Sequence, residues 1–218
     1  MLELVQRHRI VAILRGVPPQ HAPRLAETLH RAGVRLLEVA LSDEHGLPAL
    51  EAILAARLEG LQVGAGTVTT LERARAAQGA GAGFLLTPHL VPEVHRFARE
   101  QGLGLIAGAT TPSELQQARA EGSEVVKLFP AGDLGVGYLK SLFGPYPGLP
   151  VLAVGGIDAG NLADFLRAGA LGAGIGSSLT RTDWQRPDFE GLEERAREIM
   201  RIAREAAPHS PSTLQEQP

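Results

Sequence analysis

The 218-residue sequence contains no cysteine, few aromatic residues and no apolar run long enough to cross a lipid bilayer. The absence of cysteine excludes disulfides, thiolate metal ligands and cysteine nucleophiles. The net charge of −3, with both signs dispersed, leaves no basic patch for nucleic acid or an anionic membrane. Because Met1–Leu4 has no cationic segment leading into an apolar core, we predict no signal peptide and a cytoplasmic location.

Lysine is also scarce, since the chain holds only Lys127 and Lys140 against nineteen arginines. Lys127 lies in the apolar run Glu124–Pro130, which predicts a buried strand, whereas Lys140 is expected to be solvated on a helix. Burial removes the hydration of an ammonium and favours the neutral amine, which is a nucleophile. Arginine keeps its proton and cannot take this role. Lys127 therefore indicates chemistry that needs an amine; the alternative is a lysine reaching solvent at a strand end.

A second buried charge is predicted at Glu38, which Leu37 and Val39 flank in another apolar run. A carboxylate in a core strand is costly unless it is paired or faces a polar site. One interpretation is an ion pair with Lys127 that only satisfies both charges. The other is acid–base chemistry beside the amine. Both predict that the two side chains lie close together, and we favour the second because buried ion pairs stabilise proteins weakly.

Short apolar runs alternate with helical segments along nearly the whole chain, and most runs are continuously apolar, as is typical of parallel strands covered on both faces. The expected strands are Ile10–Leu14, Arg35–Leu41, Gln62–Thr67, Gly83–Pro88, Leu103–Ala107, Glu124–Pro130, Pro150–Gly155 and Gly172–Ser177. The expected helices are Pro18–Ala32, Gly46–Leu58, Thr70–Gly79, Val91–Gln101, Thr111–Glu121, Val136–Phe143, Ala159–Ala168 and Asp188–Ala206, with a short extra helix at Leu2–His8.

Eight β/α units predict an α/β protein, a single-domain (β/α)8 TIM barrel over residues 1–207 with a short N-terminal helix. A doubly wound open sheet is the alternative. The polar, aperiodic residues 208–218 predict a disordered tail.

Polar and glycine residues concentrate where these strands end, and the active sites of such barrels lie at the carboxyl ends of the strands. Gly155-Gly156 and Gly176-Ser177-Ser178 follow the last two strands, where barrels commonly bind phosphate through backbone N–H groups and a helix N-terminus. The alternative is ordinary turn glycine. The glycines of the last strand do not form a dinucleotide fingerprint, and no histidines have zinc-site spacing. We therefore expect neither a cofactor nor a metal.

Seven short segments, spread between Ile10 and Leu179, can be compared with known families. They are Ile13-Leu14-Arg15, Leu37-Glu38-Val39, Val63-Gly64-Ala65-Gly66-Thr67-Val68, Thr87-Pro88-His89, Val126-Lys127-Leu128-Phe129-Pro130-Ala131, Val154-Gly155-Gly156-Ile157 and Gly176-Ser177-Ser178. With these segments the sequence resembles the class I 2-keto-3-deoxy-6-phosphogluconate (KDPG) aldolases, which are grouped with the 4-hydroxy-2-oxoglutarate and 6-phosphogalactonate aldolases. The resemblance implies a homotrimeric (β/α)8 lyase without a metal.

The resemblance also implies the roles of individual residues. Lys127 matches the Schiff-base lysine and Glu38 the general acid/base. The remaining matches are Thr67 and Pro88 in the pyruvate pocket, Phe129 beside the lysine, and Gly155, Gly156, Gly176, Ser177 and Ser178 in the phosphate-binding region.

One position departs from part of the family. Some members carry arginine four residues after the glutamate, where it helps to hold the substrate carboxylate, and this chain has Ser42. Arg15, at the end of the first strand, can supply that cation. The Leu41-Ser42 pair is nearer to the phosphogalactonate branch, so the resemblance leaves the configuration of the substrate open.

The expected reaction cleaves KDPG, a small-molecule 2-keto acid sugar phosphate, into pyruvate and glyceraldehyde 3-phosphate. A related candidate reaction splits 4-hydroxy-2-oxoglutarate into pyruvate and glyoxylate. The alternatives are a 2-keto-3-deoxy-6-phosphogalactonate aldolase, a phosphosugar epimerase or isomerase that uses Glu38 as base, and a barrel that binds sugar phosphates without turnover.

Overall fold

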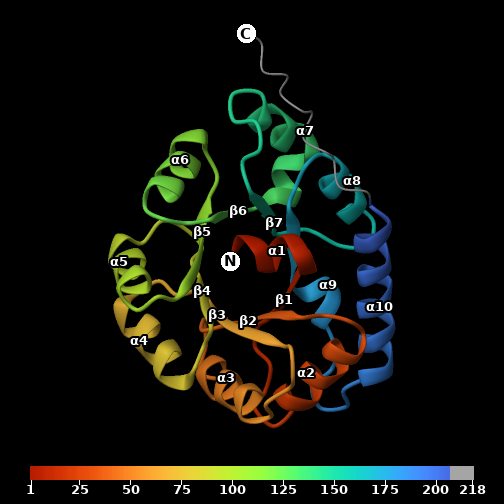
Figure 1. Cartoon of the computed structure of the whole chain (residues 1–218). Helices are drawn as coiled ribbons and strands as arrows, with labels where there is room; N and C mark the ends of the chain where they lie inside the picture. The colour runs from red at the N-terminus through yellow and green to blue at the C-terminus, as the bar shows by residue number, and fades with distance from the viewer. Residues whose placement is uncertain (207–218) are drawn as a thin grey trace.

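The structure, a computed structural model, describes residues 1–206, which form a closed barrel of eight parallel strands in sequence order (Figure 1). The strands are β1 Ile10–Leu14, β2 Leu36–Ala40, β3 Gln62–Gly66, β4 Phe84–Leu86, β5 Gly104–Ala109, β6 Val125–Leu128, β7 Val151–Val154 and β8 Gly172–Ile175. The pairing of β1 with β8 closes the barrel, which confirms the predicted fold and excludes the open sheet. The predicted tail, residues 208–218, lies outside the described residues.

Helices surround the barrel on its outside, and α1 lies across one end of it (Figure 1). They are α1 Leu2–His8, α2 Ala22–Arg31, α3 Gly46–Ala55, α4 Leu71–Ala80, α5 Pro92–Glu100, α6 Pro112–Ala120, α7 Ala131–Phe143, α8 Leu162–Arg167, α9 Ser177–Thr180 and α10 Phe189–Glu205. The extra helix α1 has the predicted bounds. Within residues 1–206, no helix combines the length and apolar character that a bilayer crossing requires.

Helix ends differ from the predicted bounds by up to four residues, and two helical segments differ more than this. α7 begins at Ala131, not at Val136, and its two parts meet at Gly135, whose φ of 79° interrupts the helix. α9 occupies Ser177–Thr180, where the sequence predicted the end of the last strand. Segments this short carry too few residues for a 3.6-residue pattern, so periodicity could not identify them.

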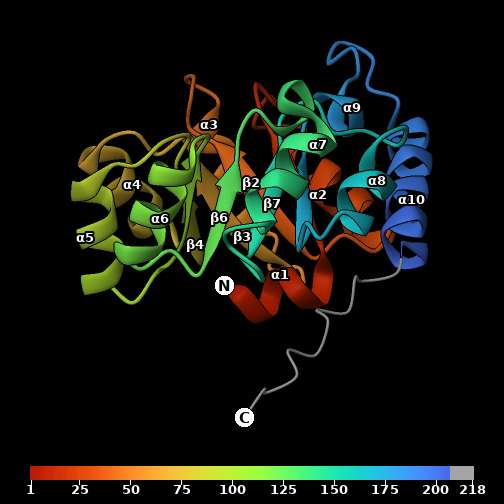
Figure 2. The same ribbon diagram turned by 90° about the horizontal axis from the view of Figure 1, so that it is seen from above.

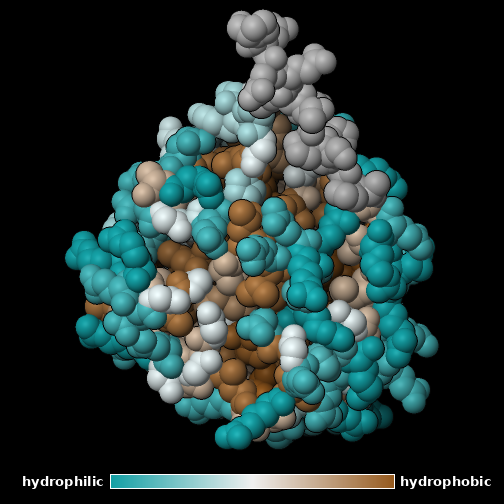
Figure 3. All heavy atoms as spheres, in the orientation of Figure 1, coloured by the Kyte–Doolittle hydropathy of each residue, from teal (hydrophilic) through white to brown (hydrophobic). Residues whose placement is uncertain are grey.

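α1 covers the amino-terminal end of the barrel (Figure 2). Its Val5 belongs to the apolar cluster inside the barrel, and its partly buried residues Leu2 and Leu4 pack against that cluster. Seen from this end, hydrophilic residues lie mostly around the rim, over the outer helices (Figure 3). Because α1 blocks this end, a ligand reaches the barrel interior from the carboxyl ends of the strands.

Alternation along the strands places the two predicted charges inside the barrel. Leu36 of β2 belongs to the interior cluster, and Glu38 follows it by two residues, on the same side of the strand. Val125 of β6 belongs to the same cluster, and Lys127 follows it by two residues in the same way. Their strands, β2 and β6, are four places apart in a ring of eight. The two side chains therefore face each other across the interior.

Candidate active site

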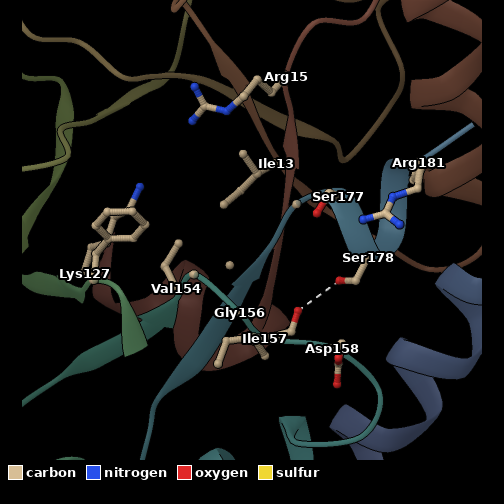
Figure 4. A pocket seen from close by; sticks show the side chains of 14 residues that line it. Ile13, Arg15, Lys127, Val154, Gly156, Ile157, Asp158, Ser177, Ser178 and Arg181 are labelled. Atoms are coloured by element: carbon tan, nitrogen blue, oxygen red, sulfur yellow. Dashed lines mark hydrogen bonds between the residues drawn. The ribbon is translucent and has the colours of Figure 1, made fainter. Parts of the chain in front are cut away.

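A cavity of about 360 Å³ opens at the carboxyl ends of β1, β6, β7 and β8 (Figure 4). It is lined by Ile13, Arg15, Lys127, Phe129, Val154, Gly155, Gly156, Ile157, Asp158, Gly174, Gly176, Ser177, Ser178 and Arg181. Eight predicted site residues lie in this wall, namely Arg15, Lys127, Phe129, Gly155, Gly156, Gly176, Ser177 and Ser178. Glu38, Thr67 and Pro88 do not line the cavity, and each adjoins it through a neighbour.

Lys127 and Glu38 form the centre of the site. Nζ of Lys127 lies 4.0 Å from Oε1 of Glu38, too far for a direct hydrogen bond but near enough for strong attraction. Glu38 is fully buried and Lys127 is 6% exposed. Neither carboxylate oxygen of Glu38 has a hydrogen-bond partner within residues 1–206. The predicted proximity of the two side chains is confirmed.

Gly66, at the end of β3, provides the room for the Glu38 side chain. A Cβ at Gly66 would overlap the Glu38 carboxylate. The adjacent Thr67 has a φ of 56°, which is a strained conformation for a β-branched residue. Such strain costs on the order of 1–3 kcal/mol and is commonly found at functional sites.

Arg15 extends from the end of β1 and is held by two hydroxyls. Its Nη1 donates to Oγ of Ser42 at 2.8 Å, and its Nη2 donates to Oγ1 of Thr67 at 3.3 Å. Thr67 thus adjoins the cavity through Arg15. Ser42 and Thr67 thereby orient the Arg15 side chain.

Phe129 lies near the Lys127 amine, and Pro88 lies against the strand beside Lys127. Nζ of Lys127 lies 5.5 Å from the centroid of the Phe129 ring, and Phe129 is 40% exposed. Pro88 lies against Gly108 of β5, where a Cβ would overlap the Pro88 carbonyl. Gly108 is in turn the β5 partner of Lys127 in the strand register. The absence of a side chain at Gly108 thus lets Pro88 approach the strand beside the lysine.

The loops after β7 and β8 form the far side of the cavity from Lys127 (Figure 4). Gly155 and Gly156 have φ values of 89° and 69°, so both positions favour glycine. The hydroxyl of Ser178 donates to the carbonyl oxygen of Ile157 at 2.9 Å, which ties the two loops together. Ser177 makes no such side-chain bond within the described chain and faces the cavity.

Sequence reasoning missed two charged residues of the wall, Asp158 and Arg181. Both are exposed residues in loops, and nothing local separates Arg181 from the other eighteen arginines. The sequence did contain one signal for Arg181, its closeness to the predicted phosphate-binding segment Gly176-Ser177-Ser178, which it follows by three residues. No three His, Asp or Glu side chains of residues 1–206 gather as a metal site.

The cavity is lined by one amine, Lys127, and by two further cations, Arg15 and Arg181, and the unpartnered Glu38 carboxylate lies behind the amine. An amine can form an imine with a ketone, the carboxylate can accept or donate a proton, and the cations suit a substrate with two anionic groups.

Known proteins are similar to this chain in sequence and fold. Residues 1–194 match the KDPG and KHG aldolase family. A 2-dehydro-3-deoxy-6-phosphogalactonate aldolase of Escherichia coli is 32% identical over 90% of this chain and 95% of its own length. A 2-dehydro-3-deoxy-phosphogluconate aldolase of Treponema pallidum is 36% identical over 76% of this chain and 79% of its own.

Among solved structures, a KDPG aldolase of Legionella pneumophila holds pyruvate captured as a covalent carbinolamine intermediate. It aligns with a TM-score of 0.79 at 25% identity, over 93% of this chain and 96% of its own. From the match over residues 1–194, the chain belongs to the KDPG and KHG aldolase family.

Proposed function

We propose that the chain is a class I aldolase that cleaves KDPG into pyruvate and glyceraldehyde 3-phosphate. The observation that carries the proposal is the Lys127 amine, placed 4.0 Å from the unpartnered Glu38 carboxylate inside the barrel of an aldolase-family chain. In the Legionella relative pyruvate is bound as a carbinolamine, the adduct that an amine forms with a ketone. Lys127 supplies the corresponding amine here.

The reaction begins when the Lys127 ammonium loses its proton to solvent and the resulting neutral amine attacks the C2 ketone of the substrate. Loss of water from the carbinolamine leaves a protonated imine, which acts as an electron sink. Glu38, directly or through a water molecule, takes the proton from the C4 hydroxyl, and the C3–C4 bond breaks. The aldehyde leaves, and the enamine on Lys127 takes a proton at C3. Hydrolysis of the resulting imine releases pyruvate and regenerates the amine.

The remaining site residues hold the two ends of the substrate. Arg15, oriented by Ser42 and Thr67, pairs with the C1 carboxylate. Pro88 and Phe129 shape the pyruvate pocket. The phosphate lies against the loops after β7 and β8, which contain Gly155, Gly156, Gly176, Ser177 and Ser178. Binding the remote phosphate helps to orient the reacting ketone at Lys127.

The test is borohydride reduction in the presence of pyruvate, followed by intact mass measurement and peptide mapping. We expect a reduced pyruvyl adduct on Lys127. A folded protein without this adduct would contradict the class I mechanism and favour the epimerase or the non-catalytic sugar-phosphate binder. Resistance of the activity to EDTA would separately argue against a metal-dependent aldolase.

The chain offers a matched control, because its second lysine, Lys140, is exposed on α7. Lys127→Arg keeps the positive charge but removes the amine, so it should abolish both the adduct and the cleavage of KDPG. Lys140→Arg makes the same chemical change on the surface and should leave both unchanged. Near-normal cleavage by Lys127→Arg would refute the mechanism.

A second candidate substrate is 2-keto-3-deoxy-6-phosphogalactonate, which differs from KDPG in its C4 configuration. It is favoured by the Leu41-Ser42 pair, which is nearer to the phosphogalactonate branch in the family resemblance. Ser42 stands where some members carry arginine, and it accepts a hydrogen bond from Arg15. The Escherichia coli phosphogalactonate relative spans 95% of its own length in the match. The ratio of kcat/KM for the two C4 epimers distinguishes the substrates, and turnover of 4-hydroxy-2-oxoglutarate is measured in the same assay.

We also propose that the enzyme is a homotrimer. The family resemblance supports this, and one structural neighbour is a cage designed by fusing symmetric oligomeric domains. Light scattering should give three times the chain mass of 23.0 kDa. A cytoplasmic location stays a prediction from the sequence.

A further inference from the structure

The wall of the cavity opposite Lys127 is short of hydroxyl donors for a phosphate. Of the two serines at the start of α9, Ser178 already donates its hydroxyl proton to the carbonyl of Ile157 at 2.9 Å, as the dashed line in Figure 4 shows. A phosphate that approached Ser178 would therefore meet an oxygen without a free proton. Ser177 is left as a hydroxyl donor in this wall, and a dianionic group needs a cation as well.

Arg181 is the cation placed to meet this need. It lies at the end of α9 and lines the same cavity as the two serines, and its guanidinium extends toward them (Figure 4). Its backbone is held on both sides, because its N–H donates to the Ser177 carbonyl and its own carbonyl accepts from Nη2 of Arg195. Within residues 1–206 its side chain forms no ion pair.

Asp158 limits where in the cavity a phosphate can bind. Asp158 also lines the cavity, and its carboxylate is fixed by the Gly160 N–H, which donates to Oδ1 at 2.8 Å. In Figure 4 this carboxylate points away from Arg181. A phosphate is repelled by Asp158 and attracted by Arg181, so it is placed on the Arg181 side, next to Ser177.

We propose that Arg181 binds the substrate phosphate and makes the enzyme selective for phosphorylated over unphosphorylated 2-keto acids. The inference rests on the proposed function, since it assigns one end of the same cavity. A guanidinium suits this position because it binds phosphate through two parallel hydrogen bonds and stays charged at every working pH.

The test compares cleavage of KDPG with cleavage of 2-keto-3-deoxygluconate, the same substrate without its phosphate. Pyruvate release is measured for the wild type, Arg181→Gln, Arg181→Lys and the control Arg186→Gln. Arg186 is an exposed arginine of the same loop and does not line the cavity. We expect Arg181→Gln to lower kcat/KM for the phosphorylated substrate by about 10- to 100-fold. Its kcat/KM for the unphosphorylated substrate should match the wild type.

Three further readouts separate a binding role from a structural one. Arg181→Lys should recover part of the loss because it restores the charge, and inorganic phosphate should inhibit Arg181→Gln more weakly than the wild type. The pyruvate adduct on Lys127 should form equally in all four proteins. Equal losses for both substrates, or no loss for the phosphorylated one, would overturn the role of Arg181. A wild type with neither adduct nor cleavage refutes the proposed function instead, and the inference falls with it.

Discussion

Replacing both charges of the Lys127–Glu38 pair should abolish activity and leave the fold as stable as before, or more stable. At the 4.0 Å between Nζ and Oε1, the attraction is about 4 kcal/mol for an effective dielectric constant of about 20. Against this, burial of each ion costs several kcal/mol of hydration. Glu38 recovers none of that cost through hydrogen bonds within residues 1–206. The pair is therefore a net burden or close to neutral for folding.

The double variant Lys127→Met/Glu38→Met removes both charges at nearly constant volume and leaves no buried polar group at either position. We expect its free energy of unfolding to equal that of the wild type or to exceed it by about 1–4 kcal/mol. The single variant Lys127→Met leaves a buried carboxylate without a counter-ion and should lose about 3–5 kcal/mol. Glu38→Gln should form the pyruvate adduct and turn over about 10²- to 10⁴-fold more slowly, the usual loss on removing an acid–base group.

Urea unfolding provides the stability measurement, with circular dichroism and the fluorescence of the single tryptophan, Trp184, as two independent signals. Pyruvate release and borohydride trapping on the same samples provide the activity. The reasoning fails if the double variant is less stable than the wild type by more than about 1 kcal/mol, a typical cost for a disruptive substitution. The pair would then be a structural ion pair, which is the alternative interpretation of the two charges.

Three other predictions follow from the described residues. Gly66→Ala should displace the Glu38 carboxylate, costing about 1–3 kcal/mol of stability and most of the activity; Gly79→Ala, in open space on α4, should be neutral or stabilising when assayed alongside it. Burial lowers the pKa of His95 below 6.5, so the folded state binds its proton less readily than the unfolded state. The free energy of unfolding should therefore fall as the pH drops below about 6.5, by at most about 1.4 kcal/mol per pH unit for this group. Urea midpoints measured over this pH range should fall less steeply for His95→Gln than for the wild type. Thr111→Ala removes the capping box of α6 and should lower the unfolding free energy by about 1 kcal/mol, whereas Thr111→Ser should retain most of it.

The strands were predictable because burial on both faces of a parallel sheet leaves uninterrupted apolar runs. β1 has the predicted bounds, whereas β6 is shorter at each end than the predicted Glu124–Pro130. The extra residues form a bend at Glu124 and a turn at Phe129 and Pro130. They make no ladder pairs, and pairing is a property of two strands together. α9 was hidden for a related reason, since one helical turn has no periodicity of its own.

The site was predictable where a polar residue interrupts a pattern and unpredictable where it does not. Glu38 and Lys127 are charges within apolar runs, so their positions stand out from the sequence alone. Arg181 interrupts nothing, because it is an exposed arginine in a polar loop. It belongs to the cavity only because closure of the barrel brings the end of β8 beside β1 and β7.

The scarcity of lysine could not by itself decide which lysine matters. The scarcity applies equally to Lys127 and Lys140, because arginine supplies nearly all the other cations of the chain. The structure separates them by environment, since Lys140 is exposed and Lys127 is 6% exposed and faces a buried carboxylate. An arginine at Lys140 loses nothing, whereas an arginine at Lys127 keeps the attraction to Glu38 and loses the nucleophile. The argument for catalysis therefore rests on this asymmetry, and the paired Lys→Arg variants measure it directly.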